Sequence, residues 1–447
     1  MQKKAALTLV IVLFTLSWTI CARDLNLTIY NNDLALIRDA RQVSVPVGTG
    51  VKLGFTDVSA LIEPSSVFFK SQAKVREQNF EYDLIDQFKL LQKYLGSKIR
   101  MVQEKSVVDG TLLSMQGGLV IEQDNKKLLL SPKGEIELPA LPAGLIVKPT
   151  LSWILDNKVG GLQDIQLSYL SRGFSWEAAY VLKLSDSEGT GELNGWVTVR
   201  NTSGSSYPDA ALQLVAGDPH RAEAPAPEGG RMYKVRAVAD EAFKEETFFE
   251  YHLYDLAGRT DINNAQDKQL SLLTAPAVPL QKKYELANRL SYGLGQLAKL
   301  NPTVKVSFMN SAAGGLGMPL PKGKFRIYKA DSKGRLQFVG EDNIDHTPKD
   351  EKVELTVGTA FDIVAEKTLK LDQRINDRLY EKTLEVVIRN HKDSDIIVEI
   401  VESFYRNIKV LNSSHKYLDR DARTAVFSVP VAKDSSATLR YTAQVEN

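Results

Sequence analysis

The strongest constraint on the fold of this chain is a two-residue hydrophobic period in the segment Leu167–Asp218. Apolar and polar residues alternate there in short runs, and clusters of glycine, serine and asparagine separate the runs. Successive side chains of a β-strand point to opposite faces, so this alternation is typical of strands that bury one face. The residues between the runs are those that tight turns require. The segment therefore predicts an all-β domain.

The first 22 residues have the pattern of an export signal. Lys3 and Lys4 provide a positive start, Ala5–Leu16 is an apolar stretch, and residues 20–22 can serve as a small-residue cleavage site. The apolar stretch is shorter than the roughly 20 residues that a membrane-spanning helix needs. We therefore expect cleavage near Ala22 and an extracytoplasmic protein, periplasmic or secreted. Lipidation of Cys21 or an uncleaved anchor is the alternative.

The composition excludes several classes of protein. Cys21 is the only cysteine, so a chain without residues 1–22 has none and forms no disulfide. The 56 basic residues fall to 54 when Lys3 and Lys4 are removed, against 55 acidic residues, and no polybasic tract remains. We therefore expect no nucleic-acid partner. No later segment is apolar enough to span a membrane, so stability must come from large apolar cores.

Turn signals and strand-like runs divide the chain into several β-modules, mostly β-sandwiches. In chain order these are an N-terminal β domain at 23–80 that continues at 139–150, a small barrel at 81–138, a central β-sandwich at 150–370 with a loop or linker at 219–245, and a terminal sandwich of the immunoglobulin or fibronectin kind at 371–447. Within the central module, Glu241–Leu256 fits either a short helix or a strand.

The barrel prediction depends on one helical segment followed by five short strands. Apolar residues from Leu84 to Leu95 recur on one helix face, with Asp83 placed to cap its start and Gly96 to end it. The strands are expected at Lys98–Val102, Val107–Met115, Leu119–Glu122, Lys127–Ser131 and Glu135–Leu138. This order resembles a small Sm-like or SH3-like barrel. Some such barrels bind RNA, but the loop residues that RNA binding needs are not evident after Ser131, so a structural barrel is the better interpretation.

The sequence contains no pattern typical of a catalytic or metal site. Its five histidines, at 220, 252, 346, 391 and 415, do not stand three or four residues apart. The nucleophile elbow Gly-x-Ser-x-Gly does not occur. The glycine-rich run Gly189–Gly195 lacks the lysine and helix of a phosphate cradle, so it predicts a hairpin turn. We therefore predict no cofactor, no metal ligand and no catalytic residue.

Two polar clusters remain as candidate binding residues. Asp345 and His346 have the residue types of an acid–base pair, although a solvated loop that caps its own backbone is the simpler interpretation. Tyr251, His252 and Tyr254 form an aromatic cluster that either stacks on a sugar or peptide or belongs to a core. For three strand tryptophans we expect core positions, namely Trp153, Trp176 and Trp196.

Three strand ends share a short, weakly similar sequence pattern. Asn201, Asn310 and Asn390 each end a strand-like run and precede a polar or glycine-rich turn. Asparagine tolerates positive φ and forms hydrogen bonds to nearby backbone, which suits a strand exit. Both a duplicated unit and independent use of the same turn chemistry explain this pattern.

Four segments together resemble one bacterial family. They are YNNDLALIRDARQVSVPVG, LSYLSRGFSWEAAYVLKL, LNGWVTVRNTSGSSYPDAALQLVAGD and GRLQFVGEDNIDHTPKDE. The family is the domain-of-unknown-function family grouped with mucoidy inhibitor A proteins, and the resemblance extends from about Asp24 to Val445. Mucoidy-type members carry a long coiled coil between their β regions, where this chain has the small barrel. The resemblance implies an exported, β-rich envelope protein and carries over no catalytic residue.

These observations favour an exported envelope protein with a non-catalytic binding or scaffold role, whose partner is an envelope protein or a glycan. The alternative is an extracytoplasmic hydrolase that cleaves polysaccharide or peptide through paired carboxylates. That alternative requires a concave pocket in which two acids converge.

Overall fold

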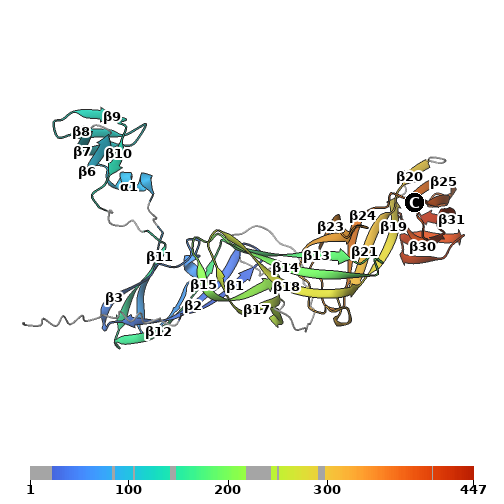
Figure 1. Ribbon diagram of the computed structural model, residues 1–447, viewed down its shortest axis with the longest axis horizontal. Helices are drawn as coiled ribbons and strands as arrows, with labels where there is room; N and C mark the ends of the chain where they lie inside the picture. Colours follow the sequence, from blue (N-terminus) through green and yellow to red (C-terminus); the bar gives the residue numbers. More distant parts are fainter. Residues whose placement is uncertain are drawn as a thin grey trace, which may run out of the picture.

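The computed structural model describes residues 23–82, 86–103, 106–140, 147–217, 243–248, 251–289, 297–404 and 406–446. Within these ranges the chain is almost entirely β-strand, with one α-helix and the two 3-10 helices η1 (Pro64–Ser66) and η2 (Ala312–Gly314), so the all-β prediction is confirmed. The described strands form six sheets, and Figure 1 shows the small sheet beside α1 at one end of the molecule and the two C-terminal sheets at the other. The predicted signal lies outside these ranges, as does the predicted loop at 219–245 up to residue 242.

The first sheet joins the start of the chain to strands from much later in the sequence. Strand β1 pairs in parallel with β15, with Leu25 opposite Ala210, and β2 pairs antiparallel with β12. One hydrophobic core lies under these strands and continues under the central sheet. The sheet order is β16 (Phe243–Phe248), β17 (Tyr251–Ile262), β15 (Tyr207–Ala216), β1 (Arg23–Tyr30), β2 (Leu34–Val45), β12 (Gly161–Ser171), β4 (Phe68–Lys70). The predicted units 23–80 and 150–370 thus share a sheet, and the ambiguous segment Glu241–Leu256 contributes strands.

A three-stranded sheet leads toward the segment predicted as a barrel. Its order is β3 (Gly48–Phe55), β11 (Thr150–Asn157), β5 (Lys74–Glu81). Trp153 of β11 is only 1% exposed and stacks on Phe69 with ring centroids 4.3 Å apart. Its indole Nε1 donates to Oε1 of Gln78 at 2.8 Å, which satisfies the one polar group of the ring. The predicted core position of Trp153 is therefore confirmed.

The segment predicted as a barrel contains one helix and five antiparallel strands, as expected. The helix α1 (Gln87–Lys93) is shorter than predicted: Oδ1 of Asp86 caps it by accepting from the Lys89 N–H at 2.8 Å, and residues 83–85 lie outside the described ranges. Leu91 is buried, whereas Phe88 and Leu95, expected on the same apolar face, are exposed. The sheet order is β10 (Glu135–Glu137), β6 (Lys98–Gln103), β7 (Ser106–Ser114), β8 (Val120–Gln123), β9 (Leu128–Leu130). A separate small core fills this unit.

The central sheet has one buried and one open face. Along β13, Trp176, Ala178 and Tyr180 point into the core, while the residues between them are partly or fully exposed. The sheet is mixed, since β13 pairs in parallel with β22, and this alternation shows that one of its faces is open to water. The order is β18 (Gln266–Pro279), β14 (Thr190–Asn201), β13 (Phe174–Leu184), β22 (Gly323–Ala330), β23 (Leu336–Ile344).

The C-terminal region is a pair of sheets around a second core. The first has the order β24 (Lys352–Thr359), β21 (Thr303–Met309), β19 (Gln281–Arg289), β27 (Ile396–Ser403), β30 (Thr424–Val431), β29 (Tyr417–Asp421). The second has the order β20 (Leu297–Leu300), β25 (Ile363–Asn376), β26 (Leu379–Asn390), β31 (Ser435–Glu446), β28 (Ile408–Ser413). Strands from before residue 371 complete both sheets: β19 pairs in parallel with β27 in the first, and β20 pairs with β25 in the second. The predicted boundary at residue 371 falls inside β25.

The three asparagines of this shared pattern make the same kind of hydrogen bonds at three strand ends. Asn201, Asn310 and Asn390 are at most 1% exposed. Each side-chain N–H donates to carbonyls of the adjoining loops, for example to Met318 and Pro348 from Asn310 at 2.8 and 2.9 Å. Each side-chain oxygen accepts from a backbone N–H further along the chain, from Ser203, Gly317 and Lys392 respectively. Buried loop carbonyls need such partners, so these side chains hold the strand exits in one conformation.

We expect Asn310→Ala to lower the free energy of unfolding by about 1–3 kcal/mol, because the substitution leaves buried loop carbonyls without a donor. Chemical denaturation followed by circular dichroism measures this change. Asn412→Ala, at an exposed position of β28, is the matched control and should stay within about 0.5 kcal/mol of the wild type. Equal effects of the two substitutions would contradict a special role for the buried amide.

A grid of charges covers the exposed side of β19, β21 and β24. Glu354 lies 2.9 Å from the ammonium groups of both Lys283 and Lys305, and Lys305 also lies 2.7 Å from Glu285. Partial burial alone would raise the pKa of Glu354, but the hydrogen bonds and charges of the two lysines outweigh it and lower that pKa to about 2. The folded state therefore favours the ionised carboxylate.

This pKa shift predicts an acid-sensitive contribution to stability. The stabilisation from Glu354 is fully present above the ordinary glutamate pKa of 4.5 and is lost as the pH falls from there toward about 2. We expect Glu354→Gln to flatten the dependence of unfolding free energy on pH in that window, with little change in the slope near neutral pH. Glu381→Gln, at a half-buried position of β26, is the control and should show the same pH dependence as the wild type in that window. If Glu354→Gln showed the same pH dependence as the wild type in this acidic window, the stabilising role of the ionised Glu354 would be contradicted.

Candidate binding site

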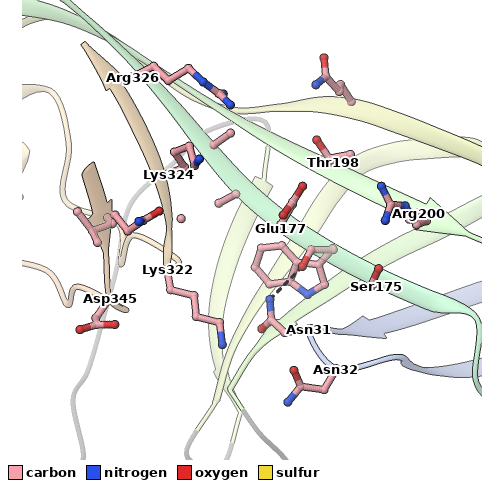
Figure 2. A pocket seen from close by; sticks show the side chains of 17 residues that line it. Asn31, Asn32, Ser175, Glu177, Thr198, Arg200, Lys322, Lys324, Arg326 and Asp345 are labelled. Atoms are coloured by element: carbon pink, nitrogen blue, oxygen red, sulfur yellow. Dashed lines mark hydrogen bonds between the residues drawn. The ribbon is translucent and has the colours of Figure 1, made fainter. Parts of the chain in front are cut away.

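A hollow of about 760 Å³ lies on the open face of the central sheet. Its floor is formed by exposed side chains of β13, including Ser175 and Glu177, and by Thr198 and Arg200 of the neighbouring β14. The loop residues Asn31, Asn32 and Lys322 line it from one side, as Figure 2 shows. The strand alternation explains this composition, because every second residue of β13 and β14 faces outward while its neighbours fill the core.

Most of the cations that line this hollow are paired with carboxylates. Arg200 is held by Asp267 through two hydrogen bonds of 2.8 Å, which raise the pKa of Arg200 and lower that of Asp267. Lys324 and Arg326 both lie beside Glu341, at 3.2 and 3.7 Å. Three further charged residues line the hollow and form no ion pair within the described part of the chain, namely Glu177, Lys322 and Asp345. The hollow is thus lined by four cations and two carboxylates, and Asp267 and Glu341, which do not line it, pair with three of those cations.

Asn31 lines the hollow, and its carboxamide is only partly satisfied by hydrogen bonds from the described residues. Its Nδ2 donates to the carbonyl of Trp176 at 3.2 Å, which fixes the carboxamide plane. Its Oδ1 is buried and receives no hydrogen bond from any described residue. A buried carbonyl oxygen without a donor is rare in folded proteins, and a bound ligand or water commonly supplies the missing donor. In the view of Figure 2, Asn31 and Lys322 extend toward one another.

The loop that carries Lys322 is anchored at several points. The hydroxyl groups of Tyr254 and Tyr180, both buried, donate to the carbonyls of Pro319 and Pro321 at 3.1 and 2.8 Å. The backbone N–H of Lys322 donates to Nδ1 of His346 at 3.2 Å. Burial raises the pKa of Tyr180 well above its ordinary value, so its hydroxyl stays protonated and able to donate. The Lys322 backbone is therefore positioned before any ligand arrives.

The five residues predicted to bind do not form one cluster. Asp345 lines the hollow, whereas the His346 ring holds the Lys322 backbone, so the two are neighbours with separate tasks. Tyr254 is 1% exposed and belongs to the core. Tyr251 and His252 lie half-buried at the start of β17 and are not among the lining residues. The aromatic cluster thus supports the site through Tyr254 and does not form its surface.

The prediction that Trp196 is a core residue is wrong. Trp176 is 3% exposed, as expected, but Trp196 is 41% exposed on the open face of β14. The two tryptophans lie on neighbouring strands with opposite orientation. The sequence contained the signal for this difference, because Trp196 is in phase with Asn194, Thr198 and Arg200, whereas Val197 and Val199 are the buried positions.

Other kinds of site find no support in the described ranges. No group of three or more histidine, cysteine, aspartate or glutamate side chains there could hold a metal ion. In the same ranges, no helix has both the length and the apolar character to cross a membrane.

Comparison with known proteins leaves the family undecided. No protein-family model matches the chain, and no curated protein matches it. The resemblance to the family grouped with mucoidy inhibitor A proteins therefore stays an expectation from the quoted segments.

Tyr254→Phe keeps the buried ring but removes the donor to the Pro319 carbonyl. We expect faster hydrogen exchange at the Leu320 and Lys322 amides, which the same loop orders, and a loss of about 1 kcal/mol in unfolding free energy. Tyr417→Phe, at an exposed tyrosine of β29, should change neither quantity. Unchanged exchange at both amides in Tyr254→Phe would show that the hydroxyl does not hold this loop.

Proposed function

We propose that this protein is exported to the cell envelope and acts there as a non-catalytic binding protein, with its ligand on the open face of the central sheet. The observation that carries the proposal is the anchored arrangement of Lys322 and Asn31 at the hollow. Side chains on a rigid frame bind without a large ordering cost, and the buried Oδ1 of Asn31 has no hydrogen-bond donor among the described residues. Such an arrangement suits recognition of a polar ligand.

Cleavage at the predicted position is compatible with the first described strand. Strand β1 covers Arg23–Tyr30. The Arg23 guanidinium lies 2.7 Å from the Asp39 carboxylate, which is almost fully buried. Cleavage after Ala22 would leave this strand and its ion pair whole. The resemblance to an envelope family favours export.

The export part of the proposal predicts a defined N-terminus. When the full chain is expressed in a bacterium, N-terminal sequencing of the protein from the extracytoplasmic fraction should begin at Arg23. A variant without residues 2–22 should stay in the cytoplasm. Full-length protein that still begins at Met1 in the cytoplasmic fraction would contradict export.

The binding part predicts a loss of ligand when the charge at the hollow is reversed. An immobilised wild-type protein should retain a specific component of an envelope extract, and Lys322→Glu should lose it. Lys433→Glu makes the same charge change at an exposed position of the C-terminal sheets and should retain the component. Equal retention by wild type and both variants would place the ligand elsewhere.

The hydrolase alternative makes a different prediction at the same place. Glu177 and Asp345 are the carboxylates among the described lining residues of the hollow, and Figure 2 shows them on different elements with Lys322 and Lys324 also present. If the retained component were cleaved by the wild type, and by neither Glu177→Gln nor Asp345→Asn, the protein would be an enzyme and the non-catalytic proposal would fail.

A further inference from the structure

Trp196 is unusual because its neighbours leave the indole uncovered. On one side, in β13, the residue opposite Trp196 is Ala179, and on the other side, in β18, it is Ser271. Adjacent strands lie about 4.8 Å apart, so small residues at both positions keep the space beside the ring open. A side chain of this size normally buries most of its apolar surface. At 41% exposure the indole offers apolar surface on which a ligand can stack.

The backbone is specially shaped at this point. The pairing of β14 with β18 shifts register between Gly195 and Trp196, so that Leu272 is the extra residue of a β-bulge. Bulges turn side chains to new directions and are frequent beside functional sites. Gly195 is required there, because a Cβ at that position would lie 2.8 Å from Cγ of Leu273. The bulge and the glycine together set the direction of the indole.

Hydrogen-bonding side chains surround the indole and connect it to the hollow. Thr198 follows Trp196 on the same face, and its neighbours across the strands are Glu177 in β13 and Gln269 in β18. All three line the hollow that also contains Asn31. An open aromatic surface next to carboxylate, amide and hydroxyl groups matches a sugar ring, which has an apolar C–H face and a rim of hydroxyl groups.

The geometry favours this ligand over the two other polymers of an envelope. An extended peptide usually adds to the free edge of a sheet through main-chain hydrogen bonds, but Trp196 lies on the face of β14, which is paired on both sides. A strongly anionic polymer would need several unpaired cations, whereas three of the four cations that line the hollow already pair with carboxylates. A neutral saccharide needs neither.

We propose that Trp196 is the stacking platform of a subsite for neutral saccharides, and that Glu177, Thr198 and Gln269 bind the hydroxyl groups of the sugar. This inference rests on the proposed binding function and names its ligand class. The subsite extends the hollow along β14, so a chain of several sugar rings would reach from Trp196 toward Asn31.

The tryptophan content of the chain provides a direct test. Trp153 and Trp176 are buried, and Trp18 lies in the predicted signal, so Trp196 is the solvent-accessible tryptophan of the described residues. The mature protein would be titrated with hexamers of β-1,4-linked glucose, β-1,4-linked N-acetylglucosamine and α-1,4-linked glucose. Binding should protect tryptophan fluorescence from quenching by acrylamide, and calorimetry should give the dissociation constant.

We expect at least one of these hexamers to bind, with Trp196→Ala weakening it about tenfold or more, as for an anchor residue of an interface. Trp196→Phe, which keeps an aromatic ring, should have a dissociation constant between those of the wild type and Trp196→Ala. Phe338→Ala, at an exposed aromatic of the edge strand β23, should bind as the wild type does. Circular dichroism of each variant shows whether it is folded.

Two results of the titrations would overturn the inference. One is the absence of binding to all three hexamers. The other is binding that Trp196→Ala leaves unchanged. If the envelope component lost by Lys322→Glu is still retained by Trp196→Ala, the saccharide inference fails while the proposed binding function stands. If neither variant affects retention, both fail.

Discussion

A sheet that buries one face must leave the other face to water or to a partner, and this constraint determines most of the structure. In β13 and β14 the buried face carries Trp176, Tyr180 and Val197 into the large core, so the residues between them are free to serve recognition. The open face is thus a direct product of the period that builds the core. Without a cysteine after residue 21, the chain depends on such cores throughout.

Local pattern sufficed to predict much of this architecture. The five short strands of the barrel segment and the all-β class followed from strand alternation and turn residues, because both are determined within a few residues. The parallel pairing of β1 with β15 was not predictable in this way, because the residues of neither strand indicate which distant strand it will pair with. For the same reason, predicted segment limits at residues 80 and 371 run through shared sheets or strands.

The candidate site shows the same division between local and distant information. The orientation of Trp196 was readable from the alternation around it, but its size favoured a core position over an exposed one. Lys322 gave no signal, because its position depends on the hydroxyl groups of Tyr180 and Tyr254, which come from two other strands. His346 was noticed for its acid–base chemistry, yet in the fold its ring accepts a backbone hydrogen bond. A residue type suggests a chemistry, and only the partner decides which chemistry is used.

Buried polar contacts complete what the apolar cores begin. Lys367 of β25 and Glu402 of β27 are at most 2% exposed and form an ion pair between the two C-terminal sheets. Tyr441 of β31 lies beside this pair, and both its burial and the charge of Glu402 raise the pKa of its hydroxyl group. Such a pair contributes little net stability compared with apolar residues of the same size, but losing one partner leaves a buried charge at a cost of about 3–5 kcal/mol. Apolar side chains tolerate many arrangements of two sheets, whereas this pair and the three buried asparagines tolerate few. The cores therefore supply the stability, and the buried polar groups restrict the chain to one arrangement of its sheets and loops.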